Sequence, residues 1–228
     1  MEIKYCLPII ADSISQCRAR ISEAQSLYQY FEVWLDYLND PEDCLDLAQE
    51  LGSRGIFLFR RMKLEEPRMS TVIRQALLSE LATYDILIDF DLSSQSEDLA
   101  FFRSLPKRVA TLICSYHNYS RTPELSELRE LEQQMLKGQP SIFKFSCFCN
   151  SPRDAVRLLD FRLELNERRR KSIVLGMGEH GLVTRVFGTL WGNEMIFAPR
   201  HRSQQSAPEQ LTRTELESVF RSLERKEN

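Results

Sequence analysis

Two side chains suited to amine and proton-transfer chemistry occur in apolar segments of this 228-residue chain. Lys144 interrupts the apolar run of residues 141–148, and His117 ends the run that begins at residue 108. Burial of an ammonium group is costly and lowers its pKa, which favours an amine nucleophile. A histidine can accept or donate a proton near neutral pH. The pair predicts a site where Lys144 forms an imine and His117 serves as general base and acid.

Both residues also have a purely structural interpretation. Lys144 could extend its ammonium group to water from a strand end, or pair with a carboxylate. His117 could be a hydrogen-bonded histidine of the core or of a turn. The two together, on neighbouring predicted strands, are a more specific signal than either alone.

Eight short apolar runs, rich in Ile, Val, Phe and Leu, provide the elements that would position these side chains. Runs of this kind are typical of strands buried on both faces of a parallel sheet. They cover residues 3–10, 30–38, 55–60, 85–92, 108–117, 141–148, 172–177 and 194–199.

The stretches between the runs carry helix-start signals, in which a capping side chain precedes a proline or an acidic or amide residue three positions on. These signals are Ser13 with Gln16, Asp40-Pro41, Ser94 with Glu97, Thr122-Pro123, Ser151-Pro152 and Thr214 with Glu217. Eight strand–helix units give about 28 residues per unit, the compact end of the range for a (β/α)₈ barrel. We therefore expect an α/β fold with one compact TIM barrel, a single catalytic domain over residues 1–228.

A doubly wound open sheet is the competing architecture. Such a sheet normally has a glycine-rich phosphate-binding turn after an early strand. Here the first turn reads Ala11-Asp12-Ser13-Ile14, and the whole chain has only 8 glycines. The barrel is therefore favoured.

Composition excludes several classes of function. The net charge of −3 gives no electrostatic signature of nucleic-acid or membrane binding, and no apolar run is long enough to span a bilayer. The first residues do not resemble a signal peptide, so we expect a cytoplasmic protein with six reduced cysteines. Cys147 and Cys149 have no second Cys or His pair at a fitting spacing, so no metal is expected.

In a barrel, reactive residues lie at the carboxyl ends of the strands. The polar residues at or just after those ends are Glu32, Asp36, Arg60, Asp89, Asp91, His117, Lys144, Arg185, Ser206 and Gln210.

Several segments that contain these residues resemble, in order, the motifs of type I 3-dehydroquinate dehydratases of the shikimate pathway. They are residues 6–9, 32–36, 57–60, 115–119 with 122–123, 143–144, 177–185 and 206–210. The resemblance implies a hydro-lyase that needs no metal or cofactor. Lys144 would form a Schiff base with the C3 ketone of 3-dehydroquinate, and His117 would move the C2 proton and then protonate the departing C1 hydroxyl. It further implies that the substrate carboxylate binds Arg185, while its hydroxyl groups are held by Glu32, Arg60, Ser206 and Gln210.

The chain departs from the pattern of that family at several positions. Trp34 stands where an arginine is usual, and Glu209 where a glycine is usual. Asp91 and Asn118 replace the more usual Glu and Asp. The family also has a glutamate four residues after the arginine of the third strand, where this chain has Leu64. Glu65 and Glu66 follow directly and are the expected acidic partners of His117.

Two other functions stay open at this point. One is a different imine-forming lyase on the same barrel, such as an aldolase, which would use Lys144 on another substrate. The other is a catalytically weakened barrel that binds a ligand. The expected partner is a small molecule, and the oligomeric state is open, with a homodimer as one option.

Overall fold

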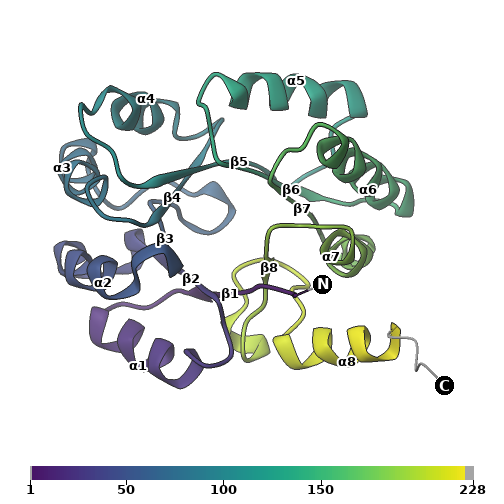
Figure 1. The fold of residues 1–228 in the computed structure, drawn as a ribbon, viewed down its shortest axis with the longest axis horizontal. Coiled ribbons are helices and arrows are strands. Elements are labelled where there is room, and N and C mark those ends of the chain that lie inside the picture. The colour runs from purple at the N-terminus through teal and green to yellow at the C-terminus, as the bar shows by residue number, and fades with distance from the viewer. Residues whose placement is uncertain (1, 224–228) are drawn as a thin grey trace.

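The computed structural model describes residues 2–223, which form one eight-stranded parallel sheet surrounded by eight helices (Figure 1). The strands are β1 (Tyr5–Ile9), β2 (Tyr30–Trp34), β3 (Gly55–Leu58), β4 (Leu87–Asp91), β5 (Thr111–Asn118), β6 (Ile142–Phe148), β7 (Ser172–Met177) and β8 (Ile196–Phe197). The α-helices are α1 (Ile14–Ala24), α2 (Cys44–Leu51), α3 (Thr71–Leu81), α4 (Ser96–Ser104), α5 (Leu125–Leu136), α6 (Pro152–Glu167), α7 (Leu182–Leu190) and α8 (Arg213–Leu223).

The strands follow one another around a nearly closed barrel. Their order is β7-β6-β5-β4-β3-β2-β1-β8, and every paired neighbour is parallel. The gap between β7 and the chain entering β8 is bridged by Glu194 N–H, which donates to the Ser172 carbonyl at 2.9 Å. The structure thus confirms the predicted (β/α)₈ barrel and excludes the doubly wound sheet.

Short 3₁₀ turns supplement the regular elements, and two of them matter for the site: η4 (Met62–Leu64) after β3 and η5 (Glu179–Gly181) after β7. The last strand is shorter than predicted, since only two residues of the run 194–199 pair with β1.

The helix-start signals were correct only in part. Ser151 and Asp154 form the reciprocal capping box that begins α6. In contrast, Ser13 makes no capping hydrogen bond to α1. At α8 the reciprocal bonds join Thr212 with Glu215, two residues before the predicted pair.

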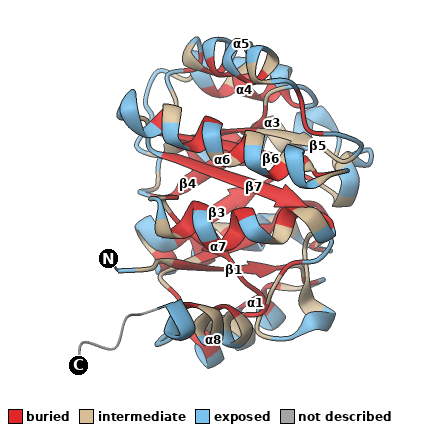
Figure 2. Ribbon diagram, turned by 90° about the vertical axis from the view of Figure 1, so that its right-hand side faces the viewer, coloured by how far each residue is buried: buried red, intermediate tan, exposed pale blue. Residues whose placement is uncertain are grey.

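Two apolar layers stabilise the barrel, one between the sheet and the helices and one inside the barrel. Buried residues concentrate along the strands and the inner faces of the helices, while the outer helix faces are exposed (Figure 2). The layer inside the barrel is made of Cys6, Ile56, Leu87, Ile113, Ile142, Ile173, Leu175, Met195 and Phe197.

Strand alternation places a polar layer directly above this apolar plug. Successive side chains of a strand point to opposite faces, so residues two apart share the barrel interior. On β6 Lys144 follows Ile142 on that face, and on β5 Ser115 follows Ile113. The parallel register sets Ser115 beside Lys144. The carboxyl ends of the strands therefore carry the charged groups, as expected for a barrel active site.

All six cysteines are buried and unpaired. Burial raises the pKa of each thiol, to about 11 for Cys17 and about 12 for Cys44 and Cys114. Within residues 2–223 there is no cluster of His, Cys, Asp and Glu that could hold a metal ion. Over the same range, none of the helices combines the length and the apolar character needed to cross a bilayer.

Candidate active site

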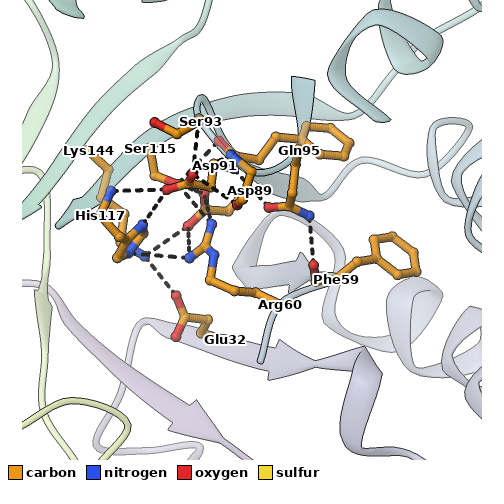
Figure 3. Close-up of polar contacts among 12 residues, drawn as sticks. Glu32, Phe59, Arg60, Asp89, Asp91, Ser93, Gln95, Ser115, His117 and Lys144 are labelled. Carbon is orange, nitrogen blue, oxygen red and sulfur yellow. Dashed lines mark hydrogen bonds and ion pairs between the residues drawn. The ribbon is translucent and has the colours of Figure 1, made fainter. Parts of the chain in front are cut away.

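The amine of Lys144 lies inside the barrel between two carboxylates. Its Nζ is 2.8 Å from Asp89 Oδ2 and 3.0 Å from Glu32 Oε1 (Figure 3). The ring of Phe197 lies on a further side, with its centroid 4.2 Å from Nζ. Lys144 is only 4% exposed, so β2, β4 and β8 together hold the amine in place.

These two carboxylates overturn the expectation of a lowered pKa for Lys144. Burial by itself lowers the pKa of the ammonium, but the charges of Asp89 and Glu32 outweigh it, and the net pKa is raised above its usual value. The resting lysine is therefore a buried, paired ammonium. It must lose a proton before it can attack a carbonyl group.

His117 is oriented by Asp91 and not by the predicted Glu65 or Glu66. Asp91 Oδ2 accepts a hydrogen bond from His117 Nδ1 at 2.9 Å and another from the His117 backbone N–H at 3.0 Å. Glu65 is 54% exposed and pairs instead with Arg61. The acidic partner thus comes from the end of β4, where Asp91 replaces the more usual Glu of the family.

The contacts of the imidazole define its tautomer. Because the carboxylate of Asp91 can only accept, Nδ1 carries the proton. Nε2 then presents its lone pair, 3.4 Å from Nη1 of Arg60. Burial, followed by the charge of Arg60, lowers the pKa of His117 in spite of Asp91. Burial raises the pKa of Asp91, but the bond and charge of His117 outweigh it and bring that pKa down to about 2. The histidine is therefore neutral at neutral pH, with Nε2 able to accept a proton.

Arg60 and Ser115 connect the amine to the imidazole. Arg60 Nη2 lies 2.9 Å from Asp89 Oδ1 and donates to Ser115 Oγ at 2.8 Å. Ser115 Oγ in turn donates to Asp89 Oδ1 at 2.5 Å. Asp89 is fully buried, and although burial raises its pKa, the charges of Arg60 and Lys144 hold that pKa well below the usual range. Asp89 therefore stays charged and ties β3, β4, β5 and β6 together.

A second cation, Arg185, faces the same pocket and has no carboxylate partner among residues 2–223. It lies in the first turn of α7 and is 1% exposed. Its Nε and Nη1 have no hydrogen-bond partner within residues 2–223. Burial lowers the pKa of the guanidinium to about 10, and only the charge of Cys149 acts against it. A buried guanidinium with free donors is suited to a carboxylate ligand.

Two glycines allow α7 to bring Arg185 to the barrel mouth. The turn after β7 packs so closely that a Cβ on Gly181 would lie 2.4 Å from the backbone carbon of Gly176. Thr184 Oγ1 fixes the turn, since it accepts from Gly176 N–H and donates to the Gly181 carbonyl, both at 2.6 Å.

The loop after β8 forms the remaining wall of the pocket. Gln210 is buried, and its side chain donates to the Phe197 carbonyl at 3.0 Å and accepts from Ser206 N–H at 3.0 Å. Glu209 has φ +56°, a left-handed conformation that favours glycine. The complete lining comprises Glu32, His117, Tyr119, Lys144, Ser146, Leu175, Arg185, Phe197, Ser206, Ala207 and Gln210.

The structure thus brings Lys144, His117, Glu32, Arg185, Ser206 and Gln210 to one pocket, all of which were named from the sequence. Arg60 does not line the pocket; it contacts the lining residue His117 directly and is linked to Lys144 through Asp89. Tyr119, whose ring stacks on His117 with centroids 6.3 Å apart, was not predicted as a site residue, and no sequence motif assigned Asp89 a role.

Comparison with known proteins identifies the family of the chain. Residues 5–227 match the model of the type I 3-dehydroquinase family. The chain belongs to that family. Type I 3-dehydroquinases are hydro-lyases of the shikimate pathway, and a Schiff base is part of their known mechanism.

Individual relatives span nearly the whole chain. A 3-dehydroquinate dehydratase of Methanococcus vannielii is 26% identical over 225 residues, 96% of this chain and 99% of the relative. One from Coxiella burnetii is 27% identical over 203 residues, 86% of this chain and 83% of the relative.

Solved structures share the fold. The 3-dehydroquinate dehydratase of Geobacillus kaustophilus superposes with a TM-score of 0.82 at 21% identity, covering 98% of this chain and 91% of the other. The type I enzyme of Clostridium difficile, described with covalently modified comenic acid, gives a TM-score of 0.79 at 22% identity and covers 97% and 92%.

Proposed function

We propose that this protein dehydrates 3-dehydroquinate to 3-dehydroshikimate through an imine on Lys144. The observation that carries the proposal is one pocket lined by a buried amine, a neutral histidine and a guanidinium with free donors. These three groups match a substrate that has a ketone, an acidic C–H beside it and a carboxylate. Membership of the family supports the choice of substrate.

The first stage forms the imine. Lys144 sheds the proton that Asp89 and Glu32 stabilise, and its amine attacks the C3 carbonyl carbon. That proton ends on the C3 oxygen, which leaves as water and gives a protonated imine that draws electrons from the neighbouring C2–H bond. Arg185 binds the substrate carboxylate and fixes the ring, because a planar two-pronged donor matches a carboxylate. The loop of Ser206 and Gln210 covers the substrate.

In the second stage His117 acts as base and then as acid. Its Nε2 removes the C2 proton, and the resulting enamine expels the C1 hydroxyl group, which leaves as water with the proton from His117. Asp91 keeps Nδ1–H in place throughout, so that Nε2 faces the substrate. Water hydrolyses the protonated imine, releases 3-dehydroshikimate and restores the Lys144 ammonium. One water is lost overall, and no metal or cofactor takes part in these steps.

Turnover of 3-dehydroquinate, followed by the absorbance of the conjugated product, tests the proposal. Wild-type protein is expected to turn over, while Lys144→Met, which keeps the chain length but not the amine, is expected to lose activity. Imine formation without product would indicate another imine-forming lyase, and binding without an imine would indicate a ligand-binding barrel.

The cellular setting belongs to the same proposal. We infer a cytoplasmic enzyme of aromatic amino acid biosynthesis, with one catalytic domain over residues 1–228. Six unpaired cysteines support a reducing compartment. The proposed partner is the small-molecule substrate, with no role for nucleic acid or a membrane, and the mass in solution decides between a monomer and a homodimer.

A further inference from the structure

Glu32 forms a bridge between the reactive amine and an indole. Its Oε1 accepts from Lys144 Nζ at 3.0 Å, and its Oε2 accepts from the Nε1–H of Trp34 at 2.9 Å. Trp34 ends β2, two residues after Glu32, so strand alternation puts both side chains on the same face. The indole is 4% exposed. Each oxygen of this buried carboxylate therefore has its own donor.

The indole is itself held from the other side. Its ring meets Tyr37 edge-on, with centroids 6.1 Å apart and planes at 66°. The hydroxyl of Tyr37 accepts from the Met62 backbone N–H at 3.1 Å, and the Arg61 guanidinium lies 5.4 Å from the centre of the same ring. The η4 turn and β2 thus fix the direction of the Nε1–H bond.

We propose that Trp34 is a positioning residue, whose indole N–H fixes the orientation of Glu32 so that one carboxylate oxygen faces Lys144. The inference rests on the proposed function, because it assigns Glu32 a part in preparing Lys144 for imine formation. Trp34 does not itself line the pocket within the described part of the chain.

The consequence follows from the chemistry of a buried carboxylate. Without the indole donor, Oε2 would be a buried acceptor with no partner, which costs about 1–3 kcal/mol. The carboxylate relieves this by turning both oxygens toward the ammonium of Lys144. A two-oxygen contact stabilises the ammonium form and so hinders the loss of the proton that must precede attack.

A substitution of Trp34 changes none of the other titratable groups around the Lys144 amine. Burial lowers the pKa of Lys144, the charges of Asp89 and Glu32 raise it and outweigh burial, and the charge of Arg60 lowers it. The titratable groups around the amine are Cys6 from β1, Glu32 from β2, Arg60 from the segment after β3, Asp89 from β4, His117 from β5 and Tyr119 from the segment after it.

The hydrogen bond can be tested without any activity. The chain has two tryptophans, and the other, Trp191, lies just after α7 and is 39% exposed. In a Trp191→Phe protein the single indole N–H resonance reports on Trp34 alone. We expect that signal to exchange slowly with solvent, and to move upfield and exchange faster when Glu32→Ala is added. An indole signal that ignores Glu32→Ala overturns the inference.

The positioning role is tested by the pH profile of kcat/KM. Trp34→Phe keeps a ring and removes the donor, Trp34→Gln provides a neutral N–H donor, and Trp191→Phe is the matched control. We expect Trp34→Phe to lower kcat/KM about tenfold or more at neutral pH and to move the part of the pH profile that reports Lys144 deprotonation to higher pH. Trp34→Gln is expected to move that part of the profile back.

The outcomes separate this inference from the proposed function. Trp34→Phe could lower thermal stability and activity without moving the part of the pH profile that reports Lys144 deprotonation. In that case the substitution has removed packing alone, and the inference is wrong. A wild-type protein that does not dehydrate 3-dehydroquinate refutes the proposed function, and the indole signal then decides the orientation of Glu32 independently. The same signal decides it if Trp34→Phe fails to fold.

Discussion

Asp91→Asn is the sharpest perturbation of the base. Asp91 Oδ1 accepts from the N–H groups of Ser93 and Ser94 and from Ser94 Oγ, while Oδ2 accepts from the N–H and Nδ1 of His117. An asparagine must aim its NH₂ at one of these two sets of donors. The set at Oδ2 is the cheaper one to oppose, because it has one backbone N–H and an imidazole that can change tautomer, whereas the set at Oδ1 has two backbone N–H groups. Nδ1 would then accept and Nε2 would carry the proton.

The expected magnitude follows from two contributions. Replacing a charge-assisted hydrogen bond by a neutral one costs about 1 kcal/mol, and the wrong tautomer removes a general base worth about 10²–10⁴ in rate. We expect kcat/KM to fall about 500-fold or more. The free energy of unfolding is expected to fall by about 1–3 kcal/mol, because the NH₂ of the introduced asparagine opposes the backbone N–H of His117.

The assay is turnover of 3-dehydroquinate across pH, combined with a double-mutant cycle. In a His117→Ala background Asp91→Asn is expected to change the rate less than threefold, since its effect on catalysis is exerted through the imidazole. If Asp91→Asn keeps more than a third of the wild-type kcat/KM, the assignment of Asp91 as the orienting group is refuted.

Three further predictions concern other parts of the site. Arg185→Met removes a buried cation that has no carboxylate partner within residues 2–223. The free energy of unfolding, measured by thermal unfolding, should therefore rise by about 1–4 kcal/mol, while kcat/KM falls at least 100-fold. A decrease in both the free energy of unfolding and kcat/KM would contradict a guanidinium without a partner. Glu209→Gly relieves a positive φ and should raise Tm by about 2–4 °C in calorimetry, whereas the exposed control Glu66→Gly should give no gain. Because the pKa of Lys144 is raised, kcat/KM should increase from neutral to alkaline pH as the ammonium loses its proton. The increase that reports deprotonation of His117 should lie at a pH below the ordinary histidine pKa of 6.5, because the pKa of His117 is lowered. A decrease in kcat/KM above pH 7 would contradict this.

The barrel could be predicted because a strand buried on both faces has an apolar sequence of its own, which can be recognised without knowing which strands lie beside it. The eighth strand was predicted too long, since only Ile196 and Phe197 find a partner on β1. Helix starts were less predictable, because a capping side chain often has a competing tertiary partner. Thr122, for example, donates to the Phe148 carbonyl at 2.9 Å and does not cap a helix.

The reactive residues could be named from their types, but their electrostatics could not. Lys144 was correctly placed in a buried strand, and burial alone gives the wrong direction for its pKa. The carboxylates that reverse it come from β2 and β4, 112 and 55 residues away in sequence. The partner of His117 was sought next to Arg60 by analogy of spacing, whereas the barrel brings Asp91 from an adjacent strand.

The most direct test of the account is reduction of the imine. Wild-type protein is mixed with 3-dehydroquinate and borohydride, and intact and peptide masses are recorded. The account predicts one adduct per chain, on Lys144, absent from Lys144→Met and formed faster as pH rises. No adduct, or an adduct on another lysine with turnover intact, would contradict it.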